Sequence, residues 1–160
     1  MKRHIYMEFS NEESEYQFFA MKDISSVYLW DFLRDVRDRH TEQFIEWAKT
    51  TDNEGGGTNI TYLFGDKQHV YIGFDFNGLT EEQDYELKND PKYFFKITRL
   101  NFIDLLQQWK AVYQQHPHGI AVKELEDGSW KVEALTVLDV TKCKAAVDPK
   151  TEELPSDFAL

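Results

Sequence analysis

The sequence predicts an α+β fold: a single domain in which a mainly antiparallel sheet packs against about three helices. The chain has 160 residues, about the length of one domain, and 41% of them are hydrophobic, which is enough to form a core. Helical spacing of apolar residues occurs in a few stretches, and short alternating segments between turn signals fill the rest. These segments do not alternate regularly with helices, as they would in a parallel sheet.

The helices are predicted from apolar residues that recur every three or four positions. The most regular helix is expected over residues 101–115, with Asn101 as its N-cap and Pro117 beyond its end. Two earlier helices are expected over residues 26–39 and 41–50. The buried face of the 101–115 helix is predicted to consist of Phe102, Leu105, Leu106, Trp109, Val112 and Tyr113.

The strands are predicted from alternation of apolar and polar residues between turn signals. Asp127-Gly128 is a strong hairpin signal, and Asn77-Gly78 closes another alternating segment. The triple glycine within residues 52–58 predicts a flexible loop. Strands are expected over residues 60–64, 69–76, 93–98, 120–126 and 129–140, with residues 1–9 as an additional edge strand.

The sequence also predicts where the protein works and how far its domain extends. Its longest apolar runs are far shorter than the roughly 20 residues that cross a bilayer, and no secretory signal precedes Glu8. The single cysteine excludes an internal disulfide, so a cytoplasmic protein without membrane contact is expected. Pro149 and Pro155 interrupt a polar run, which predicts a domain of residues 1–147 and a weakly held tail of residues 148–160.

No motif of catalysis, metal binding or cofactor binding is present, so the chain is predicted not to be an enzyme and to need no cofactor. Cys143 lies near the expected end of a strand and belongs to no cysteine motif. His116 and His118 flank a proline and match no zinc signature. The triple glycine precedes a strand, whereas phosphate-binding loops follow a strand and open a helix.

Charge is the most informative property of the sequence. The net charge of −11 excludes direct binding of nucleic acid, because that binding depends on Lys and Arg. Acidic residues concentrate in residues 8–15 and 80–90, near aromatic residues that suit an interface. Trp47 and Tyr71 are further candidates for exposed aromatic anchors. The predicted partner-binding residues are Glu81, Glu82, Asp84, Tyr85 and Glu86, together with Glu12, Glu13, Glu15 and Tyr16.

Two segments carry a resemblance to a known class of proteins. One is Phe-Lys-Ile-Thr-Arg-Leu-Asn-Phe at residues 95–102, which runs into Leu-Leu-Gln-Gln-Trp at 105–109; the other is Asp-Gly-Ser-Trp at 127–130. With its acidic, cysteine-poor and aromatic-rich composition, the chain resembles the immunity proteins of bacterial polymorphic toxins, including those of contact-dependent inhibition systems. This resemblance implies a protein that binds and neutralises a cognate toxin, expected to be a nuclease with a basic cleft. The alternative is a small-ligand-binding or regulatory protein-interaction module without catalytic activity.

Overall fold

Two antiparallel sheets of four strands and five helices make up the residues that the computed structural model describes, which are 2–9, 16–50 and 55–160. The strands are β1 (His4–Phe9), β2 (Tyr16–Met21), β3 (Gly56–Gly57), β4 (Thr61–Gly65), β5 (His69–Phe74), β6 (Phe95–Thr98), β7 (Gly119–Glu124) and β8 (Trp130–Leu135). The helices are α1 (Ser26–Val36), α2 (Thr41–Lys49), α3 (Glu81–Leu87), α4 (Arg99–Tyr113) and α5 (Val137–Ala146). The predicted α+β class with antiparallel strands is confirmed.

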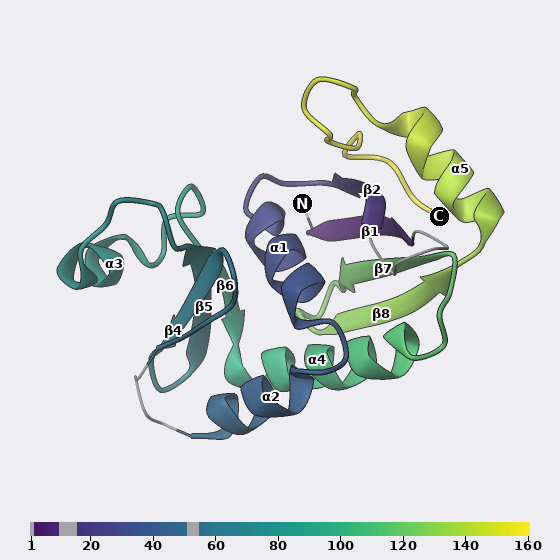
Figure 1. Cartoon of the computed structure of the whole chain (residues 1–160). Helices are drawn as coiled ribbons and strands as arrows, with labels where there is room; N and C mark the ends of the chain where they lie inside the picture. The colour runs from purple at the N-terminus through teal and green to yellow at the C-terminus, as the bar shows by residue number, and fades with distance from the viewer. Residues whose placement is uncertain (1, 10–15, 51–54) are drawn as a thin grey trace.

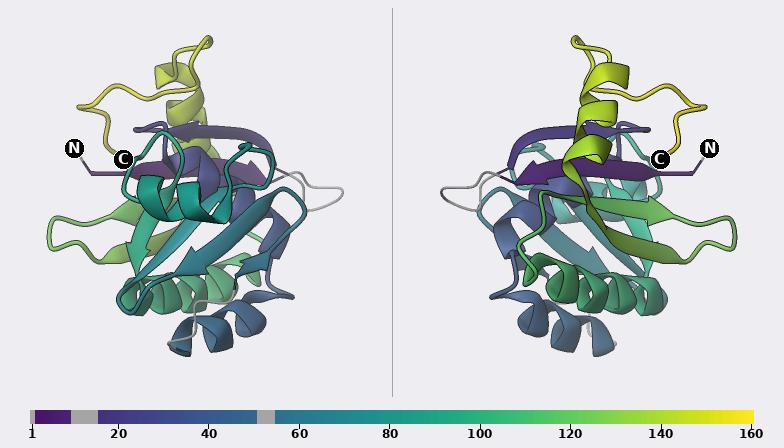
Figure 2. Two further views of the ribbon diagram at one scale, coloured as in Figure 1. Left: turned by 90° about the vertical axis from the view of Figure 1, so that its left-hand side faces the viewer. Right: turned by 90° about the vertical axis from the view of Figure 1, so that its right-hand side faces the viewer.

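The two sheets face each other across a shared core. One sheet has the order β2-β1-β7-β8 and the other the order β3-β4-β5-β6. Helix α1 lies between them, α4 runs along their lower edge, and α2 packs beneath α4 (Figure 1). Helices α3 and α5 lie at the two far ends, each outside one sheet (Figures 1 and 2). The inner faces of both sheets and the three central helices form one hydrophobic cluster.

The outer faces of both sheets are also covered, one by α5 and the other by α3 (Figure 1). For this reason, neighbouring residues of a strand can both be buried, one on each face of the sheet. In β1, Ile5 and Met7 point into the main core, while Tyr6 joins a second cluster beneath α5. In β5, Val70 belongs to the main core, while Tyr71 joins a third cluster on the α3 side. The three clusters leave no sheet face of the described residues that is wholly exposed to solvent.

An arginine connects the two sheets at one edge. Arg3 donates from Nε to the Glu124 carboxylate at 2.9 Å, and from Nη1 to the backbone carbonyl of Lys96 in β6 at 3.1 Å. Its guanidinium also lies over the rings of Phe95 and Trp130, 4.3 and 5.1 Å from their centroids. Although burial raises the pKa of Glu124, the hydrogen bonds and charge of Arg3 outweigh it and lower that pKa below its ordinary value.

Helix α1 is buried on nearly every side because both sheets pack against it. Six consecutive residues from Tyr28 to Leu33 are buried, and they include the acidic Asp31. The Asp31 side chain is only 10% exposed and pairs with Arg34 at 3.1 Å. Burial raises the pKa of Asp31 to about 6, which the charge of Arg34 reduces only in part. The ionised carboxylate therefore destabilises the fold at neutral pH.

A pH-dependent effect of Asp31→Asn follows from this position. Because the pKa of the carboxyl is near 3.9 when unfolded and about 6 when folded, the native state binds the extra proton between pH 4 and pH 6. The contribution of Asp31 to stability is therefore largest below pH 4, falls as the pH rises to 6, and then stays constant. Relative to wild type, Asp31→Asn is expected to gain on the order of 2 kcal/mol of unfolding free energy from pH 4 to pH 7. Urea unfolding at pH 4, 5.5 and 7 measures this; a difference that does not change with pH would contradict it.

The predicted helices are confirmed with corrected ends. The helix expected over residues 26–39 ends at Val36, and the one expected over residues 41–50 is α2. Helix α4 begins two residues before the expected Asn101, because the Thr98 hydroxyl accepts a hydrogen bond from the Asn101 amide and acts as the cap. The described residues form five helices rather than about three, because α3 and α5 were not predicted.

The strand predicted over residues 129–140 is wrong beyond Leu135. Thr136 caps a new helix there, and its side chain and that of Asp139 bond reciprocally to each other's backbone amides. Helix α5 then turns back over the outer face of the sheet, where Val140 and Cys143 are buried. A helix-capping signal thus replaces the end of what looked like one long strand.

The first strand and the triple glycine also differ from expectation. Strand β1 is central rather than at an edge, because it pairs with β7 on one side and with the unpredicted β2 on the other. In the expected loop of residues 52–58, Gly56 and Gly57 form the short strand β3 opposite Leu63 and Tyr62 of β4. Residues 51–54 lie outside the described part of the chain. No helix of the described residues is long and apolar enough to span a bilayer.

The C-terminal residues contact the outer side of the first sheet. The Met21 backbone bonds to Glu152 and Leu154, and Leu154 is only 6% exposed. The Phe158 ring packs edge-on against Tyr6 with a centroid distance of 5.6 Å. The division into a domain of residues 1–147 and a weakly held tail stays a prediction.

Truncation after Val147 measures how firmly the tail is held. We expect the shortened chain to stay folded, because the main core includes no residue of the tail. Its unfolding free energy should fall by about 2 kcal/mol, the amount that burial of a leucine side chain contributes. Urea unfolding with circular dichroism is the measurement. An unfolded or aggregated product would show that the tail is an integral part of the domain.

Candidate functional site

The acidic segment that the sequence singled out contains a helix, although no helix was predicted there. Thr80 caps α3: its hydroxyl accepts from the Gln83 amide, and the Gln83 side chain accepts from the Thr80 amide. Glu81, Glu82 and Asp84 stand in its first turn, where negative charge is favourable near the helix N-terminus. The Thr-Glu-Glu-Gln sequence therefore contained a capping signal that predicts this helix.

Helix α3 divides the predicted binding residues between two faces. Residues three and four positions apart share a face, so Glu81, Asp84 and Tyr85 lie together and line a cavity. Glu82 and Glu86 are exposed and do not line that cavity. Tyr85 is 47% exposed, and α3 has no buried residue. The helix therefore adds little to the core and presents most of its side chains to solvent.

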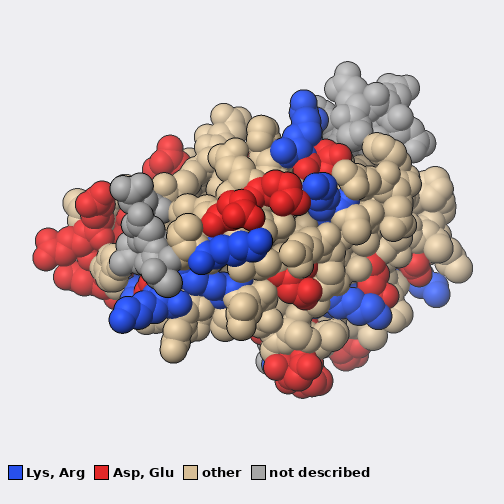
Figure 3. Space-filling view, turned by 90° about the horizontal axis from the view of Figure 1, so that it is seen from below, with Lys and Arg blue, Asp and Glu red and all other residues tan. Residues whose placement is uncertain are grey.

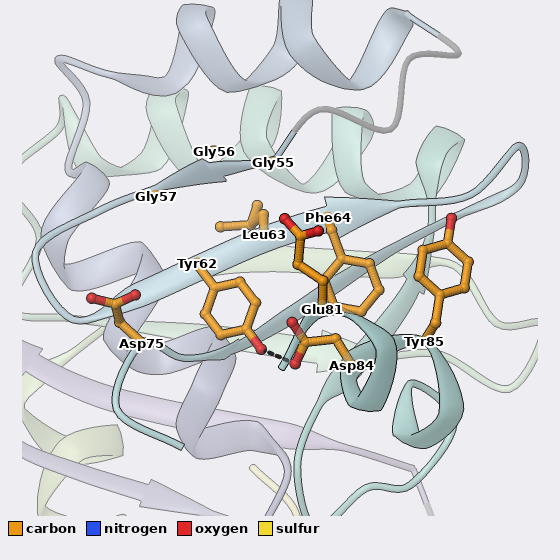
Figure 4. A pocket seen from close by; sticks show the side chains of 10 residues that line it. All are labelled: Gly55, Gly56, Gly57, Tyr62, Leu63, Phe64, Asp75, Glu81, Asp84 and Tyr85. Carbon is orange, nitrogen blue, oxygen red and sulfur yellow. Dashed lines mark hydrogen bonds between the residues drawn. The ribbon is translucent and has the colours of Figure 1, made fainter. Parts of the chain in front are cut away.

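The cavity lies between α3 and the outer side of strands β3 and β4, and its volume is about 510 Å³ (Figure 4). Small-molecule sites usually have volumes of roughly 300–1,000 Å³, so this cavity is large enough for a side chain or a small ligand. Its lining residues are Gly55, Gly56, Gly57, Tyr62, Leu63, Phe64, Asp75, Glu81, Asp84 and Tyr85.

Aromatic rings form one wall of the cavity. The Phe64 ring stacks on Tyr71 at a centroid distance of 5.1 Å, and it lies 6.2 Å from Tyr62 and 6.0 Å from Tyr85. Phe94 meets Phe64 edge-on at 5.3 Å. These contacts hold Tyr62 and Phe64 firmly, while the more exposed Tyr85 extends this wall from α3 beside Phe64 (Figure 4).

A hydrogen bond joins the sheet to α3 across the base of the cavity. The Tyr62 hydroxyl donates to Asp84 Oδ1 at 2.5 Å, and the same hydroxyl accepts from Asn77 Nδ2 at 3.0 Å (Figure 4). Burial, followed by the bond to Asp84, raises the pKa of Tyr62 above its ordinary value. Tyr62 therefore stays a protonated donor at physiological pH, and Asp84 is fixed in position.

The electrostatic character of the cavity is negative. Asp75, Glu81 and Asp84 contribute three carboxylates, and none of the lining residues that the structure describes is basic. Lys88 lies over the ring of the lining residue Tyr85 at 4.9 Å, and it pairs with Asp66 at 3.3 Å. Acidic side chains also gather at the end of the molecule over α3, at the left of Figure 3.

The structure does not describe the side chains of the other predicted binding residues. Glu12, Glu13 and Glu15 lie outside the described residues, and Tyr16 begins β2 without a described side chain. The prediction that Tyr71 is exposed is wrong: it is 1% exposed, because β5 is an interior strand with its outer face covered. Trp47 is half-buried against the main core.

The single cysteine of the chain is buried in a helix. Cys143 lies on α5 rather than near the end of a strand, and it is 1% exposed. Burial raises the pKa of its thiol to about 11, so the thiolate is scarce at neutral pH. Within the described ranges, no three His, Cys, Asp or Glu side chains are placed to hold a metal ion.

Several lining residues escaped prediction from the sequence. Tyr62 and Phe64 alternate with Leu63, so strand periodicity does place their rings on one face. Asp75 and the glycines of β3 carry no such signal, because their position depends on how β3 and the loop after β5 fold beside α3. The cavity is assembled from segments that only the tertiary fold brings together.

Comparisons with known proteins give no relative from which the role of this site could be inferred. No protein-family model, curated protein sequence or solved structure matches the chain.

Proposed function

We propose that this protein binds and neutralises a basic partner protein, in the manner of an immunity protein, through the face made by α3 and the adjoining cavity. The observation that carries the proposal is α3 itself. It buries no residue, carries acidic side chains on both faces, and stands beside an aromatic-walled cavity. A helix that adds so little to the core is well suited to binding.

The chemistry of this face fits a basic protein surface. Complementary charge raises the rate of association and selects among partners, while aromatic residues such as Tyr85 supply contact area in the centre of an interface. A net charge of −11 adds a long-range attraction to any basic partner. The resemblance to immunity proteins makes a nuclease toxin the expected partner.

Neutralisation by this face requires no catalytic step. Carboxylates of α3 would occupy the basic cleft in which a nuclease holds phosphates, and the bulk of the second sheet behind them would block access to the substrate. A protein interface of about 1,600 Å² is sufficient for tight binding when charge and shape are matched. The protein is accordingly proposed to act as a cytoplasmic inhibitor and not as an enzyme.

Charge reversal on α3 tests the proposal. The exposed Glu81, Glu82 and Glu86 would be changed together to Lys, while Asp84 is kept because it holds Tyr62. Association with a candidate basic toxin domain, for which the neighbouring genes would be searched, would be followed by stopped flow at low and high salt. We expect association to slow about tenfold or more at low salt, with a weaker dependence on salt. Co-expression should show the same variant protecting growth less well.

A matched variant controls for the change in net charge. Glu126 lies in the β7–β8 turn, and Glu153 and Asp157 lie in the segment after α5; all three are exposed. Their joint change to Lys alters the net charge by the same amount as the α3 triple. Urea unfolding would verify that both triple variants are folded. Equal slowing by both triples would show that only overall charge matters, and wild-type association in the α3 triple would contradict the proposal. A third triple at Glu12, Glu13 and Glu15 tests the other predicted acidic segment.

A second function is favoured by the cavity itself. Its volume of about 510 Å³ and its mixture of rings and carboxylates suit a small-ligand-binding module. Binding of a small cationic ligand in the cavity, without binding of any neighbouring toxin domain, would support this alternative over the inhibitor.

A further inference from the structure

We propose that the cavity beside α3 is a receptor for a single arginine side chain of the basic partner. The inference rests on the proposed function, which names a basic protein but not the group that it inserts. It is carried by the three kinds of wall that surround the cavity: aromatic rings, carboxylates and the backbone of an edge strand.

The aromatic wall suits a flat cation. The Tyr62 and Phe64 rings come from alternate positions of β4, and Tyr85 faces the same space from α3 (Figure 4). A guanidinium stacks on such rings, because its charge is attracted to the face of the π system. This protein already uses that contact elsewhere: the Arg3 guanidinium lies 4.3 Å from the centroid of Phe95.

The carboxylates suit a group that donates in several directions. Asp75 follows β5, while Glu81 and Asp84 come from α3, so acids from two segments border the same cavity (Figure 4). Asp84 Oδ1 accepts from Tyr62, and Asp75 and Glu81 are exposed. An entering cation would meet net negative charge with no basic lining residue to displace.

The third wall is the backbone of β3. Gly56 and Gly57 pair with Leu63 and Tyr62, and no strand of the described residues pairs with the other side of β3. In an antiparallel ladder, consecutive residues direct their N–H and C=O groups alternately toward and away from the partner strand. Both glycines line the cavity, and because they have no side chain, their backbone is open to a ligand there.

These walls favour arginine over lysine. Arginine has five N–H donors in a plane, so it can stack on a ring while it donates to carboxylates and to a carbonyl. Lysine offers a compact, strongly hydrated ammonium that gains less from a stacking wall. The assigned ligand is therefore the guanidinium and aliphatic stem of an arginine.

Titration with blocked amino acids tests the assignment without the partner. N-acetyl-arginine amide would be added to the labelled full chain while the amide signals of Gly56, Gly57, Tyr62 and Tyr85 are followed by NMR. We expect these signals to shift together and to saturate with a millimolar Kd. Blocked lysine should bind about threefold more weakly or worse, and blocked citrulline, a neutral isostere, should cause no saturable shift. Equal binding of citrulline, or shifts spread over all acidic surfaces without saturation, would overturn the proposal.

Two variants and one matched control locate the site. Glu81→Gln and Tyr85→Ala each remove one exposed wall residue, and each should weaken arginine binding about threefold, or about tenfold together. Glu86→Gln removes the same charge from the same helix outside the cavity and should leave the Kd within about twofold. Equal effects of Glu81→Gln and Glu86→Gln would overturn the assignment to the cavity.

The same variants separate this inference from the proposed function. Slow partner association in the α3 triple, with no arginine binding to the wild type, would overturn the arginine site and leave the inhibitor proposal standing. If blocked arginine binds saturably but no toxin domain binds, the site would be supported and the proposed inhibitor function would be overturned. The ligand of the site would then be a free guanidinium compound. If both proposals are correct, changing the inserted arginine of the partner to Gln should weaken the complex. The fold-loss in affinity should equal that caused by Glu81→Gln combined with Tyr85→Ala in this protein.

Discussion

Replacement of Trp109 by alanine is expected to lower the free energy of unfolding by about 3–5 kcal/mol. The indole is fully buried at the centre of α4, and its Nε1 donates to the Arg37 backbone carbonyl at 2.9 Å. Alanine would leave a cavity and remove the donor from a carbonyl at the end of α1. Since domains of this size are stable by only about 5–15 kcal/mol, the loss should be visible as a fall of roughly 10 °C in Tm.

Two variants control for this result. Trp109→Phe keeps most of the volume but not the N–H, and should cost about 2 kcal/mol. Leu100→Ala lies on the same helix but is 81% exposed, so its effect should be within about 0.5 kcal/mol. A Tm of Trp109→Ala equal to that of Leu100→Ala would contradict the central place of α4 in the core.

Gly119→Ala is expected to destabilise the first sheet by about 3 kcal/mol. A Cβ at this position would lie 2.4 Å from the Met7 carbonyl oxygen of β1 and 2.9 Å from a Val140 methyl group of α5. The obstacle is backbone in the central strand pair, so β1 and β7 would have to separate, and a rotamer change cannot relieve the clash. Urea unfolding and loss of amide-exchange protection in β1 measure this effect.

Gly56→Ala is the matched control within a strand. A Cβ there would have Phe44 as its nearest neighbour at 3.5 Å, an ordinary contact. Its unfolding free energy should be within about 0.5 kcal/mol of wild type. If Gly119→Ala were as well tolerated as Gly56→Ala, the close approach of β7 to β1 would be wrong.

Part of the candidate site was predictable, because its residues are neighbours in the sequence. Five acids and Tyr85 lie within residues 80–90, and that concentration is visible without a structure. The separation of Glu81 and Tyr85 from Glu82 and Glu86 was not visible, because no helix was predicted for this segment. The glycine wall and Asp75 depend on contacts between segments that lie far apart in the chain, and a local pattern contains no information about them.

By itself, the sequence determined the elements whose signals are local. The apolar spacing of α2 and α4 specified two helices, and Asp127-Gly128 specified the β7–β8 hairpin, because these patterns depend on neighbours within a few residues. It also determined the acidic character that supports the proposed partner.

Only the tertiary structure decided how these elements are arranged. It placed β1 between β2 and β7, divided the strands between two sheets, and turned α5 over the first of them. Strand order arises from pairing between distant segments: β1 pairs with β7, which lies more than 100 residues later in the chain. The cavity also depends on tertiary contacts, because α3, β3 and β4 come from separate segments of the chain. Helix α3 lies over the outer face of the second sheet without burying any of its own residues, and the cavity lies between them.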